Sequence, residues 1–153
     1  MIQRIQTLFL LCTAGLLAAM YFVPLAFLHA DDDVFYRLTV AGLKAVMGNE
    51  PDVLWLLPLL VLQSITLLLV VYTIFLYTNR RKQQRICVLN IILSAGVSLL
   101  VMFHILSLSR EMHASVQYRL PVVFPLAGII LLFLALRAIR KDEERVRSYE
   151  RLR

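Results

Sequence analysis

Long apolar stretches separated by short polar segments dominate the chain. Four of them, residues 7–29, 53–77, 86–108 and 121–139, approach or exceed the roughly 20 residues that a helix needs to cross a bilayer. Arg137 is the one formal charge within them, and it lies within a turn of the end of its stretch. Because lipid offers no partner to an unpaired backbone amide, such stretches must be helical. We expect an all-α integral membrane protein, a single domain over residues 1–153 with four transmembrane helices in an antiparallel bundle.

Two of the connecting segments carry a different pattern. Residues 36–40 and 116–120 alternate apolar and polar positions, which is the period of a β-strand. They predict short strands that pair into a small sheet outside the membrane, while the run Asp31–Asp33 leaves open a capped interfacial helix instead. Pro24 and Pro58 fall inside predicted helices near the same side, where they predict kinks and a splayed outer half of the bundle.

Composition agrees with a membrane protein. Hydrophobic residues make up 60% of the chain, charged residues 17%, and the mean hydropathy is +0.77. A soluble domain carries about 25% charged residues, so this excess of apolar side chains must face lipid. The first stretch is expected to be retained and not cleaved as a signal peptide, because Leu28 occupies a position where cleavage requires a small residue.

The Lys and Arg residues are distributed unevenly. If both termini lie on one side, that side holds twelve of the sixteen: Arg4, the four in residues 80–85 and the seven in residues 137–153. The positive-inside rule then predicts that both termini lie in the cytoplasm. Basic residues beside a span are attracted to anionic lipid, so this surface is also expected to contact anionic headgroups.

The charged tail after residue 139 has a helical pattern. Arg140 and Glu144, and likewise Glu143 and Arg147, are spaced as i,i+4 pairs, and neither Gly nor Pro occurs after Gly128. The last transmembrane helix is therefore predicted to continue into the cytoplasm as a basic helical extension over residues 140–153.

Three stretches at span ends also resemble one protein family. They read "MIQRIQTLFLL", "NRRKQQRICVLNIIL" and "ALRAIRKDEERVRSYERLR". The chain resembles, over essentially its whole length, the four-span membrane proteins of Bacteroidota known as domain of unknown function 4293. The resemblance implies an inner-membrane bundle with cytoplasmic termini, and it implies no activity, ligand or catalytic residue. It directs attention to the cytoplasmic face, whose candidate partner- or lipid-binding residues are Gln3, Arg4, Gln6, Arg80, Arg81, Lys82, Arg85, Arg145, Arg147, Tyr149, Arg151 and Leu152.

Residues able to support catalysis or bind a cofactor are sparse. Cys12 and Cys87 do not form the C-x-x-C pair of thiol oxidases, and both are expected to be reduced packing residues. His29 and His104 are placed where a bis-histidine haem is conceivable, but a lone intramembrane His more often bonds a neighbouring helix. We expect no cofactor, metal site or catalytic residue.

Polar residues within the spans lie along helical stripes. Such side chains act as interhelical packing contacts in membranes, whereas a solute path generally carries an intramembrane charge, which the middle of each span lacks. Gly15 and Ala19 give the first span a small-residue face suited to close helix approach. The candidate packing residues are Gln63, Thr66, Asn90, Ser94, Ser98 and His104.

Three classes of function follow from these patterns. The favoured one is a non-enzymatic membrane subunit or scaffold that binds another membrane or membrane-associated protein through its cytoplasmic face and helices. The alternatives are a protein that handles small solutes or lipids in a splayed outer half, and a haem-binding redox subunit. Nucleic acid is not an expected partner, because membrane topology accounts for the positive charge.

Overall fold

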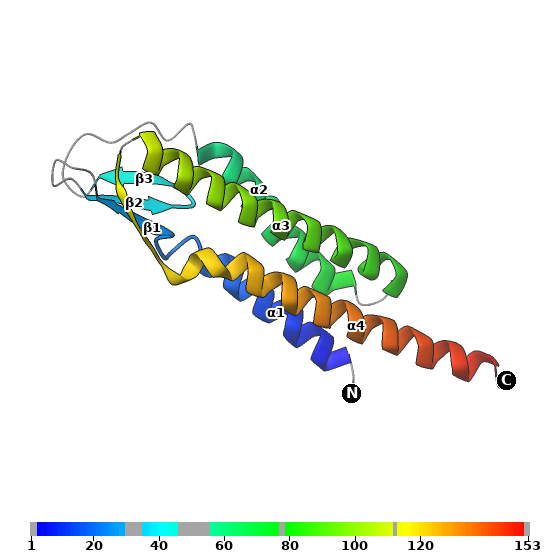
Figure 1. Ribbon diagram of the computed structural model, residues 1–153. Coiled ribbons are helices and arrows are strands. Elements are labelled where there is room, and N and C mark those ends of the chain that lie inside the picture. Colours follow the sequence, from blue (N-terminus) through cyan, green and yellow to red (C-terminus); the bar gives the residue numbers. More distant parts are fainter. Residues whose placement is uncertain (1–2, 30–34, 46–55, 77–78, 112, 152–153) are drawn as a thin grey trace.

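The computed structural model describes residues 3–29, 35–45, 56–76, 79–111 and 113–151, with the backbone alone described at 3–4, 35, 44–45 and 143–151. Within these ranges the chain forms four long helices and a small antiparallel sheet (Figure 1). In chain order the elements are α1 (Gln3–Ala19), β1 (Ala26–His29), β2 (Phe35–Thr39), β3 (Gly42–Ala45), α2 (Leu57–Phe75), α3 (Arg80–Glu111), β4 (Ser115–Tyr118), the short 3₁₀ helix η3 (Leu120–Val123) and α4 (Phe124–Arg151).

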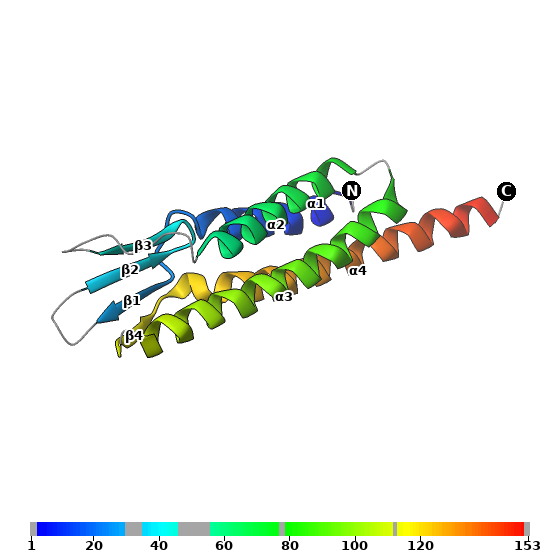
Figure 2. The same cartoon turned by 90° about the horizontal axis from the view of Figure 1, so that it is seen from above.

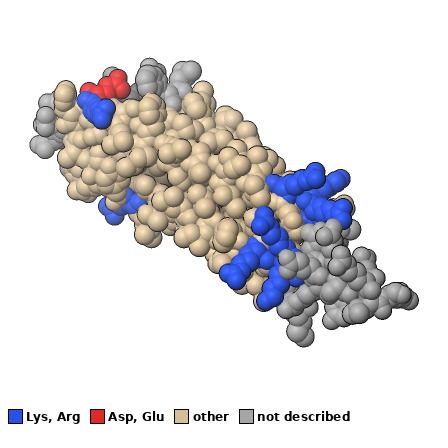
Figure 3. All heavy atoms as spheres, turned by 45° about the vertical axis from the view of Figure 1, so that its right-hand side comes forward, with Lys and Arg blue, Asp and Glu red and all other residues tan. Residues whose placement is uncertain are grey.

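The helices form a ring in which α1 packs against α2 and α4, and α3 packs against the same two helices. Figures 1 and 2 show the sheet at one end of this bundle and both termini at the other. Lys and Arg side chains gather at the end with the termini (Figure 3). We call the two ends the sheet end and the basic end.

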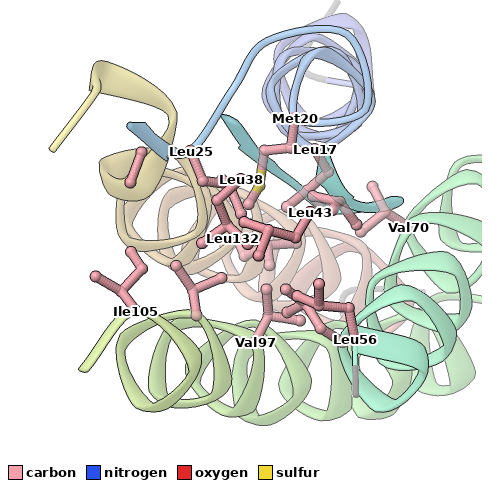
Figure 4. Packing of buried hydrophobic residues seen from close by; sticks show 14 of the residues in the cluster. Leu17, Met20, Leu25, Leu38, Leu43, Leu56, Val70, Val97, Ile105 and Leu132 are labelled. Carbon is pink, nitrogen blue, oxygen red and sulfur yellow. The ribbon is translucent and has the colours of Figure 1, made fainter. Parts of the chain in front are cut away.

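The sheet has the strand order β3-β2-β1-β4, and every neighbouring pair is antiparallel. β1 is a central strand, in which Leu28 lies opposite Tyr36 of β2 and Val116 of β4. Leu28 and Leu38 are fully buried in the core. Leu38 belongs to the same cluster of buried residues as Leu17 of α1 and Leu132 of α4 (Figure 4), so the inner face of the sheet contributes to the core.

The two strands predicted from alternation are confirmed, with small shifts of their ends. Residues 36–40 correspond to β2 and residues 116–120 to β4. They do not pair with each other, because β1 lies between them. The alternative of a capped helix falls on Asp31–Asp33, which lie outside the described residues.

The prediction that residues 7–29 form one continuous helix is wrong. α1 ends at Ala19, the chain turns, and Ala26–His29 form β1. Pro24 explains the break, since it lacks an amide donor and disfavours the α conformation in the residue before it. The 17 residues of α1 span about 25 Å, less than the roughly 30 Å hydrocarbon core.

The other three apolar stretches form α2, α3 and α4, and these helices are long and apolar enough to span a membrane. α4 continues as one helix to Arg151, which confirms the predicted helical extension. The predicted kinks are wrong: Pro58 lies in the first turn of α2, and Pro24 lies beyond α1. The sheet covers the end of the bundle that was expected to splay.

Polarity is inverted relative to a soluble bundle. Large apolar side chains such as Leu68, Leu99 and Ile130 are exposed on the helices, whereas Gln63 and Asn90 are fully buried. Such an exterior suits lipid, so the protein has the construction of an integral membrane protein. The predicted role of Gly15 in close helix approach is wrong, because Gly15 is exposed and a Cβ built there meets no atom within 4 Å.

Candidate functional site at the basic end of the bundle

Hydrogen bonds fix the basic end by connecting its helices. Gln6 Nε2 of α1 donates to the Ala138 carbonyl of α4 at 3.0 Å. Arg80, the first residue of α3, reaches α4 as well: its Nη1 lies 2.9 Å from Asp142 Oδ2 and 3.2 Å from the Asp142 carbonyl oxygen. α4 is therefore held by both of its neighbours just where it leaves the bundle.

A third contact joins α3 to α2 near the same end. Gln83 Nε2 donates to the Thr73 carbonyl at 3.1 Å, and the Gln83 amide donates to the Asn79 carbonyl, which caps the start of α3. Gln83 is buried, so this carbonyl near the end of α2 is paired without water.

The candidate binding residues fall into three groups. Gln6 is buried and bonded to α4, and Arg80 is ion-paired, so both connect helices. Arg81, Lys82 and Arg85 are exposed on the first two turns of α3. Only the backbone is described for Gln3, Arg4, Arg145, Arg147, Tyr149 and Arg151, all of which are helical, and Leu152 lies outside the described residues.

α4 projects from this end beyond the other helices (Figures 1 and 2). From Asp142, the last residue with a described contact to α3, the helix continues nine residues to Arg151, about 14 Å at 1.5 Å per residue. The base of the projection is thus fixed by the bundle, while its last turns carry the Arg residues and the Tyr of the tail.

The interior polar residues lie between the helices. Asn90 Nδ2 of α3 donates to Thr73 Oγ1 of α2 at 3.0 Å, and Gln63 Nε2 of α2 donates to the Leu17 carbonyl of α1 at 2.9 Å. Two of the six predicted packing residues therefore make cross-helix bonds. Ser94, also fully buried, has no hydrogen-bond partner for its Oγ among the described residues.

The described hydrogen bonds of the other three predicted packing residues lie within their own helices. Thr66 Oγ1 donates to the Leu62 carbonyl, Ser98 Oγ donates to the Ser94 carbonyl, and His104 Nδ1 lies 2.7 Å from the Leu100 carbonyl oxygen. In each case the partner is four residues earlier, which satisfies a hydroxyl or ring nitrogen inside an apolar environment.

Sequence reasoning missed several connecting contacts. Tyr21, in the turn after α1, bonds Ser64 of α2 at 2.8 Å between hydroxyl oxygens, and Arg80 pairs with Asp142 across 62 positions. No periodic pattern marks such pairs. The sequence offers only weak signals for these contacts: Asp142 is an acidic residue within a basic tail, and Tyr21 follows the end of α1.

The cysteines and histidines do not converge in the described part of the chain. Cys87 is buried and its thiol lies 3.4 Å from the Leu132 carbonyl oxygen of α4, while Cys12 is exposed on α1. His29 lies in β1 and His104 in α3. Among the described residues, no group of three His, Cys, Asp or Glu side chains is placed to hold a metal ion.

The chemistry available at the basic end is that of exposed guanidinium and ammonium groups, which donate charge-assisted hydrogen bonds to carboxylates and phosphates. No curated protein matches the chain significantly. A family model described as Domain of unknown function (DUF4293) matches residues 2–152. The chain belongs to this family, whose model covers the helices, the sheet and the basic end alike.

Proposed function

We propose that this protein is a non-enzymatic subunit of the bacterial inner membrane whose basic end faces the cytoplasm and docks another protein. The observation that carries the proposal is the projection of α4 as a single helix from an anchored base, beyond the bundle. A helix that served only to hold the chain in the membrane would need basic residues next to the span, whereas Arg145, Arg147 and Arg151 lie about 9 to 18 Å beyond Ile139.

The partner proposed is a protein with an acidic surface. Arg81, Lys82 and Arg85 on α3 are exposed beside the base of the projection, and the tail adds further Arg residues. Arg forms bidentate hydrogen bonds with carboxylates, and Tyr149 supplies an aromatic contact of the kind enriched at protein interfaces. The topology is part of the proposal and rests on twelve of sixteen basic residues lying on one side of a four-span chain.

The test removes residues 146–153 from the full chain and measures three properties: membrane abundance, co-purification of other proteins in mild detergent, and complementation of a deletion strain. The described contacts of α4 with the bundle lie before residue 146, so abundance should stay within about twofold of the wild type. A co-purifying protein and complementation should both be lost.

Two variants separate docking from lipid anchoring. The double change Tyr149→Ser and Leu152→Ser keeps every charge, so it should lose the partner while leaving membrane association intact. Conversely, replacing Arg145, Arg147 and Arg151 by Lys keeps attraction to anionic lipid but not bidentate contacts, and it should weaken partner recovery. If the truncated chain keeps every partner and complements fully, the docking proposal is wrong.

A further inference from the structure

A hollow of about 420 Å³ opens on α4 where the helix leaves its apolar stretch. The described residues that line it are Phe133, Leu136, Arg137, Arg140 and Lys141. Lys141 follows Phe133 by eight residues, which is about 12 Å along a helix. One end of the hollow is therefore aromatic and aliphatic, and the other end carries three cations.

The apolar half of the hollow borders the part of α4 that contacts α3. Leu136 follows Leu132 by four residues, so both occupy the same face, and the Leu132 carbonyl oxygen accepts the contact from Cys87 of α3. Phe133 is 58% exposed, which directs much of its ring toward the surroundings of the bundle, whereas Leu136 is buried. The apolar half therefore combines the buried Leu136 side chain with the Phe133 ring, which is accessible to lipid.

The cationic half of the hollow gathers three exposed basic side chains. Arg137, Arg140 and Lys141 are all exposed, and none forms an ion pair with a described side chain. The nearest described acid, Asp142, is already paired with Arg80. Arg137 lies three and four residues before the other two, a spacing at which like charges on a helix repel. An anion among the three would remove this repulsion.

We propose that this hollow is a binding site for an anionic phospholipid, with the headgroup phosphate held by Arg137, Arg140 and Lys141 and an acyl chain lying along Phe133 and Leu136. The guanidinium groups match a phosphate in bidentate geometry, and the apolar half lies toward the membrane centre, where the acyl chain of that lipid would run. A free phosphate would use the cations and leave the apolar half unoccupied. The hollow shares no residue with the docking face, so each proposal can fail without the other.

The test is native mass spectrometry of the full-length protein with phosphatidylglycerol or phosphatidylcholine of identical acyl chains. The wild type should bind phosphatidylglycerol about tenfold more tightly than phosphatidylcholine. Changing Arg137, Arg140 and Lys141 to Gln should abolish this preference. The matched control changes Arg81, Lys82 and Arg85 to Gln, removing the same charge at the same end of the bundle, and it should keep the preference within about twofold.

Two further variants guard against misfolding and identify the ligand. Arg137→Lys with Arg140→Lys preserves the charge needed for insertion and should lower phosphatidylglycerol binding about threefold, because an ammonium makes no bidentate contact. Phe133→Ala should weaken lipid binding but leave the binding of inorganic phosphate unchanged. The proposal is overturned if the wild type shows no preference, if the two Gln variants lose it equally, or if inorganic phosphate at millimolar concentration displaces the lipid.

Discussion

A hydrogen bond between Thr73 of α2 and Asn90 of α3 joins the two helices. Mutating Thr73 should destabilise the protein more than mutating Asn90. The Thr73 hydroxyl donates to the Leu69 carbonyl at 2.6 Å and accepts from Asn90 Nδ2 at 3.0 Å, and Asn90 and Thr73 are both fully buried. Thr73→Val deletes the acceptor with almost no change in shape, so the Asn90 amide is left unpaired. Asn90→Leu removes the donor together with an Oδ1 atom that has no described partner.

The magnitudes follow from that difference. A cross-helix hydrogen bond in a membrane protein contributes about 0.6 kcal/mol, and an unpaired buried donor costs about 1–3 kcal/mol. Thr73→Val should therefore destabilise the protein by about 1.5–3 kcal/mol, and Asn90→Leu by about 0.5–1 kcal/mol. The double variant no longer contains the unpaired Asn90 amide. Its loss of stability should therefore be close to that of Asn90→Leu alone.

The assay is equilibrium unfolding of the purified full chain in mixed micelles, read by circular dichroism. Thr66→Val is the matched control, since Thr66 is equally buried on the same helix and its hydroxyl donates to Leu62 of α2 itself. Its cost should stay below about 0.5 kcal/mol. If Thr73→Val and Asn90→Leu are equally costly and their effects add, the two side chains are not coupled and the reasoning fails.

Two other predictions concern topology and the ion pair at the basic end. Reporter fusions at residue 82 and after residue 153 should report the cytoplasm, and fusions near residues 44 and 113 the periplasm; a periplasmic C-terminus would overturn the four-span arrangement. Arg80→Gln should lower stability by about 1 kcal/mol, a value kept small because the Arg80 and Asp142 side chains remain 28% and 15% exposed. Thermal unfolding should show this loss to shrink at high salt, and Lys82→Gln, which removes an exposed charge two residues away, should have no comparable effect.

α2, α3 and α4 could be predicted from the sequence because a helix satisfies the backbone of a long apolar run in lipid. β2 and β4 could be predicted because their side chains alternate in polarity. β1 could not, since Ala26, Phe27 and Leu28 continue the apolar run of α1 without alternation. Pro24 marked an interruption, but it does not by itself distinguish a kinked helix from a turn into a strand.

The candidate site was less predictable than the fold, because the type of a residue does not show which other residue it will contact. Gln6 lies in a polar N-terminal segment and was assigned to the exposed binding face, yet it is buried against Ala138. The polar stripe on α3 was visible, whereas the bond from Asn90 to Thr73 depends on how α2 and α3 are rotated against each other. The hollow beside Phe133 is a feature of the folded surface of α4, which residue types alone do not reveal.

The place of β1 in the sheet bears on how α1 would cross the membrane in the proposed four-span arrangement. α1 is only about 25 Å long, so in that arrangement the residues after Ala19 would lie near the boundary of the hydrocarbon core. Non-helical backbone is tolerated there only when its polar groups are paired. β1 meets this requirement because β2 and β4 pair with it on both sides, and Arg119 beside β4 lies 4.9 Å from the centre of the Phe27 ring. Among the described strands β3 and β4 are the outer ones, so each pairs with one described neighbour, whereas β1 pairs on both sides.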